Sequence, residues 1–368
     1  MGRVRLMRTL ESDGLAPEQM AKLETCLGCY SCETVCPSKV NFGKMLDESL
    51  AKLNKQRPLP LITRMMLWLT SRITVIKNIV KLTYLSQRLG LRTLFAKLGL
   101  LKVVGLQRAN ALLGNVKYPA QLINGIIQQQ SNEQRVALFT GCFSSVMEQD
   151  IQQATIDVFN KLGIEVVIPV GQGCCGAMHR HNGELETAAT MARNNIKVFF
   201  TKKVDAIIST SSACGASLKK YDEWLNDEVL TTPVMDVSHY LADVLKQHEL
   251  EFKQMPIKVA LHTPCTLRQN EDQEEAVMEL LQKIPGLELV PLSGEPRCCG
   301  AGGSQVLSHS EMADALRDDV INEIKEIDPD VLISSNLGCV MHLRQGLVEV
   351  EMDIPLQHPV QLVSQAVV

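Results

Sequence analysis

The cysteines of this chain recur with a fixed spacing, and that repeat constrains the fold more than any other feature of the sequence. Four cysteines between residues 142 and 214 are matched by four between 265 and 339, at offsets of 123, 124, 124 and 125 residues. Such regular self-similarity predicts two copies of one structural unit. The matched residues are Cys142, Cys174, Cys175 and Cys214 in the first copy and Cys265, Cys298, Cys299 and Cys339 in the second.

Each of these cysteines lies at or just beyond the end of an apolar, strand-like run, and helical patterns intervene at 186–203, 271–284 and 311–327. This alternation predicts α/β architecture: two pseudo-symmetric βαβ repeats with parallel sheets. Because sites gather at the carboxyl ends of parallel strands, the four thiols of one copy are expected to converge and to match the ligands of an iron–sulfur cubane. Ordinary buried cysteines are the alternative, which eight residues in register make improbable. The glycines after each pair, Gly176, Gly300, Gly302 and Gly303, allow close backbone approach.

A second cysteine motif lies near the N-terminus. Residues 26–37 read CLGCYSCETVCP, which is the C-x2-C-x2-C-x3-C-P spacing of a ferredoxin-type 4Fe-4S motif. Zinc is the alternative, but zinc sites usually join two separated C-x2-C pairs. In two-cluster ferredoxins the fourth cysteine of a motif binds the other cluster, so Cys26, Cys29 and Cys32 need a thiol from elsewhere, and Cys36 is expected to belong to a second cluster.

The charge is concentrated between the two cysteine regions. From Ser49 to Asn132 there is no Asp or Glu but there are 13 Lys and Arg, in a chain of net charge −4. The pattern predicts a basic amphipathic helix with Lys77, Lys81 and Arg88 on one face. Basic residues interrupt it too often for a transmembrane span. Either the stretch is a helical linker that packs on its own domains, or it is a surface for an anionic membrane or an acidic partner.

Composition narrows the remaining function classes. The chain begins without a secretory signal, so we expect a cytoplasmic protein in which disulfides are unlikely. Aromatic residues make up 4% of the sequence, which disfavours nucleic-acid binding. Gln305 interrupts the glycine pattern of a dinucleotide loop at GAGGSQ. His262 and His342 lie three residues from Cys265 and Cys339 and could tune a cluster or carry protons, although a core role is the more ordinary one for either.

Together these motifs resemble the iron–sulfur subunit of bacterial glycolate oxidase, within the CCG-domain superfamily of heterodisulfide reductase subunits. The segments that carry the resemblance are GRVRLMRTLESDG, CLGCYSCETVCPSKVNFGKMLD, RPLP, GCF, LGIEVV, GCCGAMHRHN, ARNNI, SSACGASLKKY, HTPCTLRQ, CCGAGG and NLGCVMHL. The resemblance implies 4Fe-4S clusters on this chain, flavin on partner dehydrogenase subunits, and electron transfer from glycolate oxidation towards membrane quinone. It implies no catalytic residue here, and a cytoplasmic protein that can lie on the inner face of the membrane.

The chain departs from this family in two respects. Relatives carry two ferredoxin motifs, and this chain has only the second, so it looks short at its N-terminus. The closing C-x2-C of the heterodisulfide reductases is also incomplete, because Ser211 and Asn336 stand at its first position. The resemblance therefore implies a conventional cluster, or one empty copy, rather than the five-ligand site of those enzymes.

Four regions are expected from these arguments. They are a partial ferredoxin-type segment at 1–57, a basic helical region at 58–131, and the two repeats at 132–250 and 251–368. The alternatives to a glycolate system are a related 2-hydroxy acid (D-lactate) or glycerol-3-phosphate dehydrogenase, a heterodisulfide reductase-like catalytic subunit, and a zinc-stapled scaffold.

Overall fold

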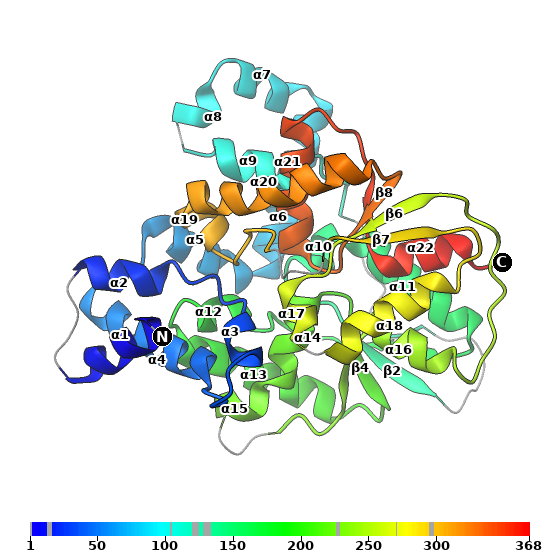
Figure 1. The fold of residues 1–368 in the computed structure, drawn as a ribbon, viewed down its shortest axis with the longest axis horizontal. Coiled ribbons are helices and arrows are strands. Elements are labelled where there is room, and N and C mark those ends of the chain that lie inside the picture. Colours follow the sequence, from blue (N-terminus) through cyan, green and yellow to red (C-terminus); the bar gives the residue numbers. More distant parts are fainter. Residues whose placement is uncertain are drawn as a thin grey trace.

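The protein is described by a computed structural model that covers residues 2–12, 17–103, 105–119, 125–127, 134–225, 229–269, 271–293 and 298–368. The two sheets are separated by a layer of helices, further helices cover their outer faces, and a helical N-terminal third packs along one flank (Figure 1). The expectation of α/β architecture with two cysteine-rich repeats is confirmed.

The first sheet belongs to the first copy of the repeat. Its strand order is β1-β3-β2-β4-β5, and all neighbours are parallel except β1, which is antiparallel to β3. The core strands are short Val-, Ile- and Leu-rich runs buried on both faces, as expected for parallel strands covered by helices. The strands are β1 (Gly125–Ile127), β2 (Arg135–Phe139), β3 (Glu165–Ile168), β4 (Ala206–Ser209) and β5 (Val234–Asp236).

The second sheet reproduces the parallel part of the first. Its order, β7-β6-β8-β9, has the same topology as β3-β2-β4-β5, and all its strands are parallel. The repeat in the cysteines is therefore a repeat of the backbone. The strands are β6 (Lys258–Leu261), β7 (Glu288–Pro291), β8 (Val331–Ile333) and β9 (Leu356–Gln357).

The two copies share one hydrophobic core. Alternate strand residues point to opposite faces, so Val136 and Leu138 join Val259 and Leu261 in a single buried cluster. Helix α11 (Gln149–Lys161) of the first copy packs on α22 (Pro359–Ala366) of the second, and α16 (Val237–Val244) packs on α18 (Glu271–Gln282).

The outer face of each sheet is covered by its own helices. These are α13 (Leu185–Phe200), α14 (Ser212–Lys219) and α15 (Tyr221–Leu225) in the first copy, and α20 (Ser310–Ile327) and α21 (Leu337–Glu349) in the second. Four-residue helices follow the strands: α10 (Ser144–Met147), α12 (Ala177–Arg180), α17 (Cys265–Arg268) and α19 (Gln305–Ser308).

The N-terminal third is entirely helical as far as it is described. The segment that carries the first cysteine motif forms α1 (Gly2–Ser12), α2 (Pro17–Glu24), α3 (Ser31–Thr34) and α4 (Phe42–Gln56). The basic stretch is helical as expected, but it is a series of helices rather than one. These are α5 (Leu61–Thr70), α6 (Ile73–Arg88), α7 (Leu91–Lys97), α8 (Leu100–Val103) and α9 (Gln107–Leu113).

Glycines divide this stretch. Gly90, Gly99 and Gly105 have φ near +70°, a left-handed conformation that ends a helix and favours glycine. Residue 104 and residues 120–124 and 128–132 of the basic stretch lie outside the described part of the chain. Within the described part, no helix is both long and apolar enough to cross a membrane.

Candidate metal centre

Nine of the twelve cysteines line one cavity of about 470 Å³. The cavity lies at the carboxyl ends of β2, β3 and β4 and of the corresponding strands β6, β7 and β8, where the loops of both copies face each other. Helices α5, α6 and α9 supply an apolar wall that includes Met65, Ile79 and Leu112. The lining cysteines are Cys26, Cys142, Cys174, Cys175, Cys214, Cys265, Cys298, Cys299 and Cys339.

In the first copy the repeat cysteines are brought together as expected. The Sγ atoms of Cys142 and Cys174 lie 3.6 Å apart, and the neighbouring thiols of Cys174 and Cys214, together with burial, raise the pKa of Cys175. Asn195 donates to the carbonyl of Cys174, and the Tyr221 hydroxyl donates to that of Cys175. These two buried side chains fix the backbone of the cysteine pair.

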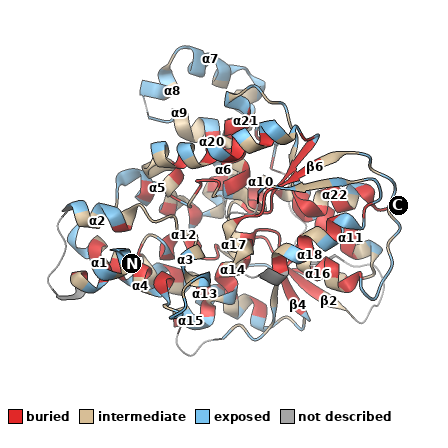
Figure 2. Ribbon diagram, viewed as in Figure 1, coloured by how far each residue is buried: buried red, intermediate tan, exposed pale blue. Residues whose placement is uncertain are grey.

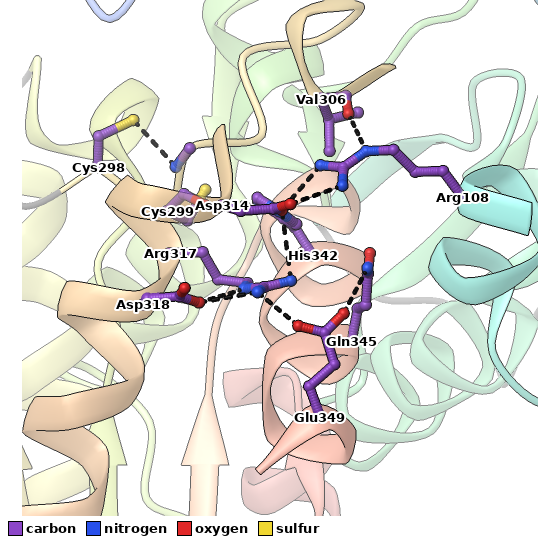
Figure 3. A network of polar contacts seen from close by, with 11 residues as sticks. Arg108, Cys298, Cys299, Val306, Asp314, Arg317, Asp318, His342, Gln345 and Glu349 are labelled. Atoms are coloured by element: carbon purple, nitrogen blue, oxygen red, sulfur yellow. Dashed lines mark hydrogen bonds and ion pairs between the residues drawn. The ribbon is translucent and has the colours of Figure 1, made fainter. Parts of the chain in front are cut away.

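The second copy repeats this arrangement with different supports. The Sγ atoms of Cys299 and Cys339 lie 2.6 Å apart, and both residues are buried. His342 from α21 binds the carbonyl of Cys299 through Nδ1 at 2.8 Å and Asp314 through Nε2 at 3.0 Å. Arg108 from α9 forms a two-point ion pair with Asp314, so α9 is tied to the backbone of the second cysteine pair (Figure 3).

The glycine after each pair has a defined role. The amide of Gly176 donates to Cys174 Sγ and that of Gly300 to Cys298 Sγ, both at 3.4 Å. Both glycines have positive φ, and a Cβ at Gly300 would clash with the carbonyl oxygen of Ala313. Only glycine fits where helix α20 passes so close, and the backbone amide is thereby aimed at the sulfur.

The pKa shifts of the buried thiols indicate what kind of group the site can bind. The hydrogen bond to Cys174 and burial raise the pKa of the Cys142 thiol, and burial raises the pKa of Cys265 to about 12. Crowded, buried thiols resist ionisation unless positive charge is placed among them. Iron–sulfur clusters bind cysteine as thiolate, and binding of the cationic centre releases the thiol protons. This set of cysteines therefore fits such a group.

The N-terminal motif lies between the two copies. Partial burial raises the pKa of Cys32, and the thiols of Cys29 and Cys26 act on it in the same direction. Tyr30, within the motif, binds His181 of the first copy at 2.8 Å, and Gln269 of the second copy donates to the carbonyl of Cys29 at 3.2 Å. Cys32 is exposed and Cys36 partly exposed.

The loop after the first cysteine pair holds the N-terminal segment in place. Arg180 forms a buried ion pair with Asp47 of α4 at 2.8 Å. His179 binds Thr70 of α5, and the Asn182 carbonyl accepts from Asn54 of α4. The conformation of this segment, residues 179–182, therefore positions α4 and α5 relative to the cysteine pair.

Comparisons with known proteins agree with this geometry. The CCG cysteine-rich domain matches residues 136–219 and 259–344. The probable glycolate oxidase iron–sulfur subunit of Bacillus subtilis is 30% identical, over 94% of this chain and 82% of that protein. The chain belongs to the family of glycolate oxidase iron–sulfur subunits. The Escherichia coli subunit of that name is 28% identical, over 99% of this chain and 87% of its own length.

A solved structure shares the fold. The crystal structure of a hypothetical protein from Helicobacter pylori superposes with a TM-score of 0.60 at 12% identity, over 99% of this chain and 66% of that one. This likeness concerns the fold alone. The CCG match and the sequence relatives identify the chain as an iron–sulfur subunit of the oxidoreductase class.

Some residues of the site were not singled out by the sequence. Asn195 and Tyr221 lie 20 or more residues from the backbone carbonyls that they bind.

Ser211 and Asn336, at the positions where heterodisulfide reductases have a cysteine, are the N-cap residues of α14 and α21. The Asn336 carboxamide accepts from the amides of Gly338 and Cys339, so it orients the helix that carries Cys339.

Proposed function

We propose that this chain is the electron-transfer subunit of a flavin-dependent complex that oxidises glycolate to glyoxylate. The flavin is carried by partner dehydrogenase subunits, and the electrons pass through this chain towards the membrane quinone pool. The observation that supports this most strongly is the convergence of nine cysteines from three separate segments on one cavity. The names of the relatives supply the glycolate system.

Each cysteine set is assigned a cluster. When bound, a 4Fe-4S cluster accepts and releases one electron at a time. Cys142, Cys174, Cys175 and Cys214 hold the first, and Cys265, Cys298, Cys299 and Cys339 the second. Cys26, Cys29, Cys32 and Cys36 are ferredoxin-type ligands, of which Cys36 serves a different cluster from the other three.

The rest of the site tunes and protects these ligands. The Gly176 and Gly300 amides stabilise negative charge on sulfur, which raises the reduction potential of a sulfur-ligated centre. Asn195, Tyr221 and His342 hold the backbone of the cysteine pairs without contacting solvent. The burial of Cys174, Cys175, Cys299 and Cys339 excludes water from the thiolates. No side chain of this chain is assigned a proton or hydride transfer.

The basic helical region is assigned to an anionic membrane surface, on the inner face. It has many Lys and Arg and no acidic residue, and apolar side chains of α5 to α8 remain exposed among them. Charge complementarity to acidic lipids together with exposed Leu and Phe is the chemistry of an interfacial helix.

The first test is iron and acid-labile sulfide per chain after anaerobic purification, with EPR of the reduced protein. We expect at least about eight irons, four for each repeat, and a loss of about four when Cys174 and Cys175 are both replaced by serine. Ala177→Ser adds a hydroxyl beside the pair without removing a ligand and serves as the matched control. Unchanged iron in the Cys174→Ser/Cys175→Ser variant, or zinc without sulfide in the wild type, would refute the assignment.

A further inference from the structure

His262 breaks the symmetry between the two copies at the metal centre. It directly follows β6, and the corresponding residue, 123 positions earlier, is Phe139, the last residue of β2. Phe139 packs in the hydrophobic core of the first copy. The second copy thus has a potential nitrogen ligand where the first has a hydrocarbon ring.

The contacts of His262 leave one ring nitrogen free. Nδ1 lies 3.0 Å from the hydroxyl of Ser334, which follows β8. Nε2 is fully buried and has no hydrogen-bond partner among the described residues. A ring nitrogen of His262 lies with the Sγ atoms of Cys299 and Cys339 in a group whose atoms are all within 4.8 Å of one another, and Nε2 is the nitrogen that has no other partner.

The other buried histidines differ. His342 contacts the Cys299 carbonyl and Asp314, and His358 contacts the Thr210 carbonyl and the Val360 amide. His179 contacts Glu184 and Thr70. In the described part of the chain each of these three side chains uses both ring nitrogens, so a merely structural role accounts for them. It does not account for His262, because burying an unpaired nitrogen carries a free-energy cost.

The arrangement around His262 is that of a metal-binding imidazole. A histidine that binds a metal usually donates its other N–H to a nearby acceptor, which fixes the ring, and Ser334 supplies that acceptor. We propose that His262 Nε2 binds iron in the second copy, beside Cys299 and Cys339. This inference rests on the proposed function, since it assumes an iron–sulfur centre in that copy.

A nitrogen ligand makes the two copies electronically different. In the second copy a neutral imidazole is added to the four thiolates assigned there, at the position where the first copy has Phe139. The first copy, with Phe139, keeps an all-thiolate set.

The test is pulsed EPR of the reduced full-length protein with and without [15N]histidine. We expect a strongly coupled nitrogen in one iron–sulfur signal that changes on labelling and is lost in His262→Phe, which introduces the residue that the first copy has. His262→Cys should keep the iron, lose the nitrogen coupling and lower the midpoint potential of that centre. His358→Asn, the matched histidine control, should retain the coupling.

Two results would overturn the inference, and they have different meanings. If Cys299→Ser removes iron but the wild type shows no strong nitrogen coupling, or His262→Phe retains it, the centre exists and His262 is not its ligand. If Cys299→Ser leaves both the iron content and the EPR signals unchanged, the second copy holds no cluster, and the proposed function fails there together with the inference.

Discussion

Glu148 is a carboxyl group buried at the junction of α10 and α11. Its Oε2 atom has no hydrogen-bond partner among the described residues. Burial raises its pKa to about 7, and nearby Asp150 contributes in the same direction. A hydrogen bond with Ser144 and the charge of Arg344 oppose the shift but do not cancel it. The folded protein therefore keeps a proton on Glu148 that the unfolded chain releases.

The sign of this shift gives a pH prediction. Between the unfolded pKa of 4.5 and the folded pKa of about 7 the folded state binds more protons, so the Glu148 contribution to stability falls as pH rises and is lowest above pH 7. Glu148→Gln should gain stability over the wild type by up to about 3 kcal/mol more at pH 8 than at pH 4.5. Anaerobic urea unfolding at several pH values measures this. Glu186→Gln, on an exposed part of α13, should show no such trend.

The sequence was least informative about the roles of individual side chains. His262 and His342 both lie three residues from a cysteine, and nothing in their spacing separates them. Their roles depend on Asp314 and Ser334, which come from α20 and from the end of β8. Those partners become neighbours only when the sheet and its helices pack, so the assignment needed the structure.

At the scale of elements, α7 and α8 form a lobe that projects from the body of the molecule (Figures 1 and 2). The lobe comprises Leu89–Val103, and its exposed apolar side chains include Leu98 at 63% and Val103 at 84%. Arg92 anchors it, because its guanidinium donates to the side chain and carbonyl of Asn110 in α9, both at 2.6 Å. The lobe is therefore held in position with its leucines facing outwards.

If the lobe enters a lipid surface, acidic residues there should weaken membrane binding. We expect Leu94→Asp/Leu98→Asp to reduce flotation with phosphatidylcholine vesicles that contain phosphatidylglycerol by at least about tenfold, because each change removes an apolar contact and adds repulsion. Phe200→Asp alters an exposed apolar side chain on α13, outside the lobe, and should bind like the wild type. Lipid docking would be contradicted if the wild type bound neutral vesicles as well as anionic ones, or if it bound neither kind. Loss of the partner dehydrogenase subunits alone would identify a protein surface instead.

The character of this region was predictable but its shape was not. The absence of acidic residues and the near-helical apolar spacing indicated basic helices, which the structure contains. The single helix expected around Lys77, Lys81 and Arg88 corresponds to α6 alone, because Gly90 and Gly99 turn the chain into separate short helices. Whether a glycine interrupts a helix depends on the packing of the flanking segments, which a periodicity does not contain.

At the scale of the whole molecule, one ion pair joins the N-terminal segment to the first copy. Asp47 of α4 and Arg180 of the cysteine loop are 5% and 9% exposed, and the Arg180 guanidinium also stacks over Trp224, 4.9 Å from the ring centre. The oxygen of Asp47 that faces His181 lies 3.5 Å from its Nδ1 atom. A buried charge pair of this kind is costly to break from one side.

Asp47→Asn should therefore destabilise the docked N-terminal segment by about 3–5 kcal/mol, since it leaves the Arg180 charge without its counterion. We expect faster proteolysis within residues 17–57 and loss of iron attributable to the N-terminal motif, with the iron of the repeats retained. Limited proteolysis combined with iron analysis measures both. Asp222→Asn, on α15 and exposed, is the control. Equal cleavage in the two variants would show that the ion pair does not hold the segment.

The general architecture followed from the sequence because it is encoded locally. Cysteines at the ends of apolar runs predicted parallel strands whose ends converge, and the structure places all eight repeat cysteines on one cavity. The assignment of individual thiols to clusters, and the four domain boundaries, stay predictions. The sequence also could not show that the two sheets share a core, because that depends on which faces of α11 and α22 meet.

That shared core sets an order of events during synthesis. Helix α11 lies near the middle of the chain, and its apolar face is covered by α22, within the last ten residues. The first copy therefore leaves the ribosome with part of its interior open to water, and it stays so until α22 has been translated. We expect the cysteine cavity between the repeats to take its final form only after α22 has left the ribosome and packed on α11.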